Sequence, residues 1–307
     1  MKKNIVRTNT NYTYEVMMED LINLRTRYDF LSWNYYGMSI MGKRIPYIRI
    51  GKGQKQVFYS AAIHANEWIN TLVLMKFIEE FSKSYELGDK IFGYSTNDIF
   101  NNASIFIAPM TNPDGVNLVL KNISEDSRCY MEARDIAENY PDIPFPNGWK
   151  SNIRGVDLNL QFPANWLEAK RIKFEQGFTK PAPRDFVGFG PLSEPESLAL
   201  YNFTVSRNFR IILSYHTQGE VIFWRYLNYE PEGAEELGKE FSRISGYILD
   251  DTIETGSYAG YRDWFISTYN RPGYTIETGK GNNPLPITQF EQIYEENLGI
   301  LVTTAIA

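Results

Sequence analysis

Residues 57–68 read Val57-Phe58-Tyr59-Ser60-Ala61-Ala62-Ile63-His64-Ala65-Asn66-Glu67-Trp68. The first seven are apolar or small, which is typical of a buried β-strand. From Trp68 to Phe81 the apolar residues recur at helical spacing, so we expect a helix to follow. The pair His64 and Glu67 therefore lies at the end of a strand, in the turn that leads into a helix.

The same alternation of strands and helices continues along the chain. Further strands are expected at residues 45–51, 103–110, 210–216 and 273–277, and further helices at residues 14–30, 232–247 and 287–305 and after Ser193-Glu194-Pro195-Glu196. The run Asn112-Pro113-Asp114-Gly115 predicts a turn, and residues 121–152 a long polar excursion. The pattern predicts an α/β fold with a mostly parallel, mixed central sheet and helices on both faces.

No internal repeat, low-complexity tract or linker divides the 307 residues, so residues 1–307 are expected to form a single domain. Within this domain, one interpretation makes residues 1–13 an irregular N-terminal arm. The formal net charge of −6 gives no basic footprint of a nucleic-acid binder. A single cysteine, Cys129, permits no disulfide within the chain.

The start of the chain has two lysines but no apolar segment typical of a signal peptide. No stretch approaches the ~18 apolar residues of a membrane span. We therefore expect a cytoplasmic protein without a membrane partner. The sequence does not indicate the oligomeric state.

The chain has only two histidines, His64 and His216. His216 ends the apolar run from Arg210, which reads as another buried strand, and ligands in parallel sheets bind at the carboxyl ends of strands. Together with Glu67, the two histidines form a ligand set with a fourth position free, which is typical of catalytic zinc. The pair His64 and Glu67, taken alone, has an alternative interpretation as two surface residues that share this spacing by chance.

Two further carboxylates fit such a site. Asp157 is a candidate to accept a hydrogen bond from the second ring nitrogen of a ligating histidine. Its alternative role is that of a turn or cap residue. Glu277 ends the strand at residues 273–277, where it is a candidate general base for a metalloenzyme. Its alternative is a structural ion pair.

Six short segments, in order and spread over roughly residues 14–305, resemble those of the zinc carboxypeptidase family, the carboxypeptidase A/B-like metallopeptidases. They are His64-Ala65-Asn66-Glu67-Trp68, Asn112-Pro113-Asp114-Gly115-Val116, Arg154-Gly155-Val156-Asp157-Leu158-Asn159, Ser193-Glu194-Pro195-Glu196, Ser214-Tyr215-His216 and Thr275-Ile276-Glu277. The resemblance implies a zinc carboxypeptidase-like fold and one Zn²⁺ per chain, held by His64, Glu67 and His216. It also implies that Glu277 activates the attacking water and later protonates the leaving amine.

The resemblance assigns further residues to the substrate. Arg154 resembles the arginine that polarises the scissile carbonyl, with Lys150 as the alternative cation. Asn159 resembles the asparagine that contacts substrate beside the leaving residue. Tyr258 resembles the substrate-capping tyrosine of the family, and Tyr261 is the alternative.

The chain departs from the family at Leu160. Carboxypeptidases of this family carry an arginine there, which grips the C-terminal carboxylate of the substrate, and leucine cannot do this. One branch of the family lacks this arginine and has a Gln-Phe-Pro-Ala pattern after it, which resembles Gln161-Phe162-Pro163-Ala164 here. The members of that branch are γ-D-glutamyl-L-diamino acid endopeptidases, which cut peptidoglycan stem peptides. Arg262 falls near the position that lines the pocket for the leaving residue, where it would suit the second carboxylate of diaminopimelate. Its alternative is a surface pair with Asp263.

The expected function is therefore zinc-dependent hydrolysis of the bond between γ-D-glutamate and the diamino acid. Three alternatives stay open at this point. They are a metallocarboxypeptidase acting on ordinary peptides with another carboxylate-binding cation such as Arg262 or Lys280, a non-catalytic peptide-binding relative, and a deacylase of small N-acyl amino acids.

Overall fold

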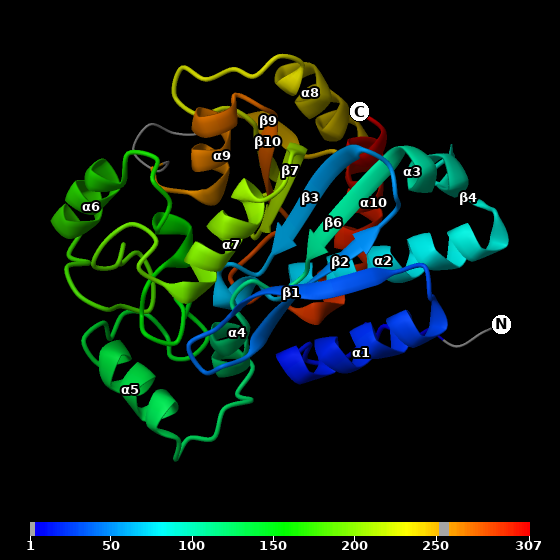
Figure 1. The fold of residues 1–307 in the computed structure, drawn as a ribbon. Coiled ribbons are helices and arrows are strands. Elements are labelled where there is room, and N and C mark those ends of the chain that lie inside the picture. Colours follow the sequence, from blue (N-terminus) through cyan, green and yellow to red (C-terminus); the bar gives the residue numbers. More distant parts are fainter. Residues whose placement is uncertain (1–3, 252–257) are drawn as a thin grey trace.

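The computed structural model describes residues 4–251 and 258–307. Within these ranges the chain forms an eight-stranded sheet and a separate two-stranded hairpin (Figure 1). The strands of the large sheet are β1 (Ser32–Met38), β2 (Arg44–Ile50), β3 (Lys55–Ala61), β6 (Ala103–Ala108), β7 (Phe209–His216), β8 (Val221–Phe223), β9 (Ile248–Asp250) and β10 (Gly273–Glu277). The hairpin pairs β4 (Lys90–Ile91) with β5 (Tyr94–Ser95).

The strand order in the large sheet is β1-β2-β6-β3-β7-β10-β8-β9. Strands β6, β3, β7 and β10 are parallel neighbours at the centre, and antiparallel pairs join them to β2 on one side and to β8 on the other. The sheet is therefore mixed and mostly parallel, as the sequence predicted. The carboxyl ends of β3, β7 and β10 meet at one edge, which places His64, His216 and Glu277 together.

Helices cover both faces of the sheet. The α-helices are α1 (Tyr14–Arg27), α2 (Ile69–Leu87), α3 (Thr96–Asn102), α4 (Pro113–Val119), α5 (Arg128–Ala137), α6 (Trp166–Glu175), α7 (Pro195–Val205), α8 (Ala234–Ser245), α9 (Tyr261–Tyr269) and α10 (Phe290–Ile306). Short 3₁₀ turns occur as η1 (Ala65–Glu67), η2 (Leu158–Leu160) and η3 (Ile287–Gln289). Helices α7 and α9 lie on one face, and α2, α8 and α10 on the other (Figure 1).

Strand β3 supplies side chains to both cores because successive side chains of a strand point to opposite faces. Val57 and Tyr59 pack into the cluster that holds α2 and α10. Phe58 packs into the other cluster, where its ring stacks on Phe209 with centroids 5.0 Å apart. The strand is buried on both faces, which explains its continuous apolar sequence.

One local expectation was wrong. Residues 113–119 form helix α4 rather than a turn, because the side chain of Asn112 accepts a hydrogen bond from Gly115 N at 3.1 Å and Pro113 occupies the first turn. The polar excursion at residues 121–152 contains helix α5, which is capped by Ser127. Residues 4–13 form neither helix nor strand.

The segment between α5 and α7, residues 138–194, runs past the carboxyl edge of the central strands (Figure 1). It carries Lys150, Arg154, Asp157, Asn159 and Leu160, so this long connection is where we expect contacts with a ligand. Among the described helices, none is both long and apolar enough to cross a membrane.

Candidate metal centre and the cleft beside it

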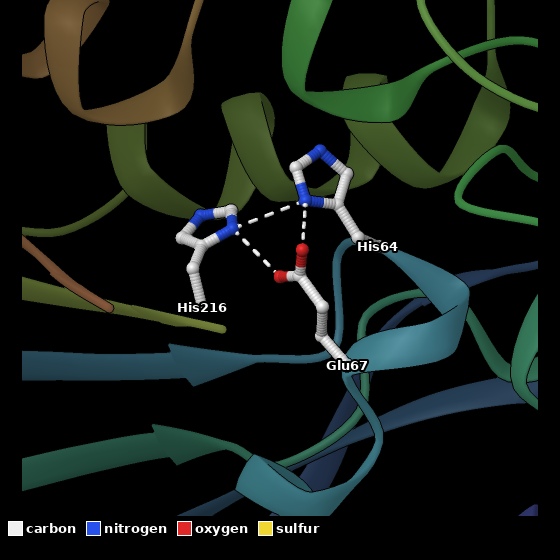
Figure 2. A group of neighbouring side chains, drawn as sticks. All are labelled: His64, Glu67 and His216. Atoms are coloured by element: carbon white, nitrogen blue, oxygen red, sulfur yellow. Dashed lines mark hydrogen bonds and ion pairs between the residues drawn. The ribbon is translucent and has the colours of Figure 1, made fainter. Parts of the chain in front are cut away.

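Three residues from two strand ends converge at the edge of the sheet. His64 follows β3 with an extended backbone (φ −90°, ψ 132°), and the single turn η1 then carries Glu67 back beneath it. His216 is the last residue of β7. The side chains of His64, Glu67 and His216 point toward one another (Figure 2).

The spacing of the ligand atoms fits a zinc ion. His64 Nδ1 lies 3.0 Å from Glu67 Oε1, His216 Nδ1 lies 3.0 Å from Glu67 Oε2, and the two Nδ1 atoms are 3.2 Å apart. Zinc bonds of 2.0–2.1 Å arranged as a tetrahedron separate neighbouring ligand atoms by about 3.3 Å. Two imidazole nitrogens and a carboxylate that face one point at this separation are the donor set of a catalytic zinc site.

The outer nitrogens of both imidazoles have partners. Asp157 Oδ1 lies 3.2 Å from His64 Nε2, and Ser214 Oγ lies 3.2 Å from His216 Nε2. Asp157 also caps η2 through the backbone N–H of Asn159, so the residue fills both roles considered from its sequence. These contacts leave Nδ1 of each histidine directed at the metal position.

The electrostatics of the centre favour a cation. Burial lowers the pKa of His64, but the carboxylates of Glu67 and Asp157 outweigh it and raise the pKa to about 9. Burial alone would raise the pKa of Glu67, yet His64, Lys150 and His216 hold it well below its usual range. Burial would also raise the pKa of Asp157, yet His64 and Lys150 hold it well below its usual range. Both carboxyl groups therefore stay ionised, as metal ligation and its support require.

Glu277 stands beside the centre. It is the register partner of His216 in the parallel pair β7–β10 and lines the cavities on both sides of the centre. Burial, and then the charge of Glu67, raise its pKa, while His216 and Lys150 oppose that rise. A carboxylate with a raised pKa next to a metal position suits proton transfer.

The two candidate cations lie in different places. Lys150 Nζ donates to Glu67 Oε1 at 3.0 Å, and burial of this amine is outweighed by Glu67, so its pKa is raised. Arg154 instead donates to Glu194 Oε2 at 2.8 Å, has a 52% exposed side chain and lines neither cavity beside the centre. The structure therefore does not bring Arg154 to the centre, and the geometry favours the sequence alternative, Lys150.

A cavity of about 340 Å³ opens on one side of the centre. Its lining includes the residues expected to contact substrate, namely Asn159, Leu160, Tyr258 and Arg262. Tyr261 is fully buried, with its hydroxyl 2.9 Å from Thr204 Oγ1, so Tyr258 is the tyrosine that faces the cavity. Gly256 and Ser257, which precede it, lie outside the described residues.

Arg262 is buried at the end of this cavity, with Nη2 at 2.6 Å from Asp263 Oδ1. Arg262 therefore pairs with Asp263, as one of the two sequence interpretations expected, but the pair is buried rather than on the surface. Lys280, the other alternative cation, is largely exposed, forms an ion pair with Glu220 and lines neither cavity.

A second cavity, of about 760 Å³, adjoins the first. It shares Lys150, Arg184, Phe223 and Glu277 with the first, so the two form one cleft across the centre. Sequence analysis did not identify Arg184, Lys173, Ser214 or Phe223 as site residues. Only Ser214 had a local signal, because it lies two residues before His216 on the same strand and so points to the same face.

A family of known proteins and individual relatives match this chain over most of its length. Residues 17–299 match the family described as zinc carboxypeptidase. The γ-D-glutamyl-L-diamino acid endopeptidase 1 of Lysinibacillus sphaericus is 43% identical over 298 residues, which cover 97% of this chain and 73% of the relative. The uncharacterized protein YqgT of Bacillus subtilis is 42% identical over 276 residues, 89% of this chain and 72% of that protein.

Among solved structures, thrombin-activatable fibrinolysis inhibitor superimposes with a TM-score of 0.74 at 16% identity, covering 99% of this chain and 76% of that one. At this identity the likeness establishes the carboxypeptidase-like fold alone.

Proposed function

The chain belongs to the zinc carboxypeptidase family and is a zinc metallopeptidase, and we propose that it hydrolyses the bond between γ-D-glutamate and the diamino acid of peptidoglycan stem peptides. The similarity to an endopeptidase with this specificity, over nearly the whole chain, carries the proposal. Leu160 supports it, because this half-buried side chain lines the cavity where related carboxypeptidases have an arginine for the C-terminal carboxylate.

The chemistry begins with the metal position. His64, Glu67 and His216 would hold a zinc ion, which would supply the Lewis acid that makes water a nucleophile near neutral pH. Asp157 and Ser214 orient the two imidazoles through their outer nitrogens. The ligands are thereby fixed before substrate arrives.

Glu277 transfers the proton. As the bond from the water oxygen to the γ-carbonyl carbon of D-glutamate forms, the Glu277 carboxylate accepts the water proton. When the carbon–nitrogen bond breaks, it delivers that proton to the amine of the leaving diamino acid. Its position across from His216, in a cleft that opens on both sides, allows both transfers by one group.

Lys150 stabilises charge on the carbonyl oxygen in this proposal. Its ammonium already lies against the metal ligand Glu67, so it is held in the cleft rather than in bulk water. A fixed cation next to a developing oxyanion lowers the barrier more than a mobile one, because the protein does not reorganise during the reaction. Arg154 remains the candidate from family resemblance alone.

The smaller cavity is assigned to the leaving diamino acid, with Asn159, Leu160 and Tyr258 around it and Arg262 at its end. A further D-alanine on the diamino acid would not meet an arginine at position 160, so both three-residue and four-residue stem peptides would fit. The larger cavity would take L-alanyl-γ-D-glutamate.

The test compares L-Ala-γ-D-Glu-meso-diaminopimelate, its D-Ala-extended form and ordinary peptides with free or amidated C-termini, with zinc or with chelator. The proposal expects L-Ala-D-Glu from both stem peptides and no loss of C-terminal residues from ordinary peptides. Release of single C-terminal residues from ordinary peptides, with the stem peptides untouched, would establish the carboxypeptidase alternative.

A further inference from the structure

Arg184 lies at the junction of the two cavities and has no part in the mechanism described above. It lines both the smaller and the larger cavity, in common with Lys150 and Glu277. The charge of Arg184 acts to lower the pKa of Lys150, and the charges of Asp157 and Glu67 act to raise the pKa of Arg184. A guanidinium therefore stands within electrostatic range of the metal ligands.

The backbone around Arg184 is fixed to the segment that carries the site. Pro183 O accepts hydrogen bonds from the N–H groups of Lys150 at 2.7 Å and Ser151 at 3.0 Å. On the other side of Arg184, Asp185 N donates to Asp157 Oδ2 at 3.2 Å. Residues on both sides of Arg184 are thus tied to the segment that holds His64 and Glu67 in place.

The side chain is held at one nitrogen and open at its tip. Arg184 Nε donates to Asp185 Oδ2 at 2.5 Å, and Lys173 Nζ donates to Asp185 Oδ1 at 2.5 Å. Within the described part of the chain, the hydrogen bonds of Arg184 involve Nε and not the terminal Nη atoms. The side chain is 44% exposed, so these terminal donors can reach a ligand in the cleft.

The larger cavity has one other cationic side chain among its described lining residues, Lys150. Its polar lining includes the uncharged side chains of Asn66, Asn147, Thr217, Asn282 and Asn283, and the carboxylate of Asp142. Lys150 also lines it, but its ammonium contacts Glu67 and is the group assigned above to the carbonyl oxygen. Among the described residues of this lining, Arg184 is therefore the cation that the proposed mechanism leaves for a second anionic group of the substrate.

The substrate proposed above carries an anion that an ordinary peptide lacks. A glutamyl residue linked through its γ-carboxyl keeps its α-carboxylate free, a few bonds from the scissile carbonyl. Planar guanidinium donors match a carboxylate better than any other side chain does. A guanidinium fixed beside the reaction centre would hold this carboxylate in a defined position.

We propose that Arg184 binds the free α-carboxylate of the γ-linked D-glutamyl residue and so selects γ-linked over α-linked substrates. The inference rests on the proposed function and deepens it, since it names the group that recognises the residue on the acyl side of the scissile bond. It places the specificity for D-glutamate in the larger cavity and that for the diamino acid in the smaller one.

The experiment uses two tripeptides, L-Ala-γ-D-Glu-meso-diaminopimelate and the same peptide with the D-glutamyl α-carboxylate converted to a carboxamide. Wild type, Arg184→Gln and Arg184→Lys are compared, with Arg243→Gln as control, because Arg243 is an exposed arginine of α8 that pairs with Glu240. We expect wild type and Arg243→Gln to prefer the carboxylate peptide in kcat/KM by roughly 10- to 100-fold, the effect of one charged hydrogen-bonded partner. In Arg184→Gln that preference falls to near unity, mainly through slower cleavage of the carboxylate peptide, and Arg184→Lys recovers part of it.

Zinc content and melting temperature of each variant separate loss of recognition from loss of folding. If wild type cleaves the carboxylate peptide and Arg184→Gln keeps the full preference, the role of Arg184 is wrong while the proposed function stands. If wild type cleaves neither tripeptide, the proposed function itself fails.

Discussion

Lys150 Nζ lies 3.0 Å from Glu67 Oε1, so a cation directly contacts a metal ligand. Arg154, four residues later, contacts Glu194 instead. This contrast favours Lys150 over Arg154, the two residues that the sequence left as alternatives for the same task.

Replacing Lys150 by methionine should reduce kcat by about 10²- to 10³-fold, the usual cost of removing one donor to a developing oxyanion. Lys150→Arg should retain more activity, since it keeps the charge. Arg154→Met should reduce kcat by less than tenfold, although it should lower the melting temperature because the buried Glu194 loses a cationic partner and keeps the neutral amide of Asn152. A large loss of kcat in a folded Arg154→Met protein, with Lys150→Met nearly active, would reverse the assignment.

The Glu277→Gln variant should bind zinc as wild type does, because Glu277 is not among the three ligands. Its kcat should fall by about 10²- to 10⁴-fold, the range for loss of a positioned general base. Metal content and single-turnover rates check this together. A zinc-loaded Glu277→Gln protein with wild-type kcat would exclude Glu277 as the proton carrier.

Asp157→Asn should weaken zinc binding by about 10- to 100-fold, because the carboxylate that accepts from His64 Nε2 fixes the ring and favours its ligation. Competition with a chelator measures the affinity. Asp142→Asn is the matched control, since Asp142 lines the larger cavity away from the imidazoles. Equal zinc affinities in the two variants would contradict the supporting role of Asp157.

Arg262→Gln should reduce the preference for meso-diaminopimelate over lysine in the leaving position by about tenfold or more, since the cation suits a second carboxylate and repels an amine. Glutamine can still hydrogen-bond to Asp263, which limits the loss of stability. The ratio of kcat/KM for the two tripeptides is the measurement. An unchanged ratio would remove Arg262 from the account of specificity.

Glu196 should make stability depend on pH. It is fully buried, and its carboxyl accepts a hydrogen bond from Ile40 N at 3.2 Å. Burial, aided by the charge of Asp114, raises its pKa from 4.5 to about 7. The folded state thus holds a proton that the unfolded state releases, and the stabilisation present below pH 4.5 is lost as the pH rises through 7.

Urea unfolding at pH 4.5 and pH 8 tests this. The free energy of unfolding of wild type should fall by about 3 kcal/mol more than that of Glu196→Gln over this interval. The same pH dependence in both proteins would show that Glu196 is not the group responsible.

The metal centre could be predicted from the sequence because its signals are local. His64 and Glu67 share one turn, and His216 ends a strand whose apolar run is unmistakable. The buried parallel strands were predicted for the same reason. The edge strands β1 and β9 and the strand β8 beside β9 were not. Strand β1 mixes polar and apolar residues, and β8 and β9 are only three residues long, so their pairing depends on neighbours distant in the chain.

The substrate cleft depends on long-range contacts that local patterns do not encode. The sequence of residues 150–154 does not indicate which of its cations pairs with Glu194. It also does not indicate that Tyr261, rather than Tyr258, is buried with its hydroxyl against Thr204. The position of Arg184 follows from hydrogen bonds between its neighbours and residues 150, 151 and 157, which no spacing predicts.

The most direct measurement is hydrolysis of L-Ala-γ-D-Glu-meso-diaminopimelyl-D-Ala in water enriched in ¹⁸O, with the label located by mass spectrometry. The account predicts one ¹⁸O atom in the γ-carboxyl of the released L-Ala-D-Glu, and no reaction in the presence of chelator. Label in the diaminopimelate carboxyl of a tripeptide, with release of D-alanine, would contradict it and identify the protein as a carboxypeptidase.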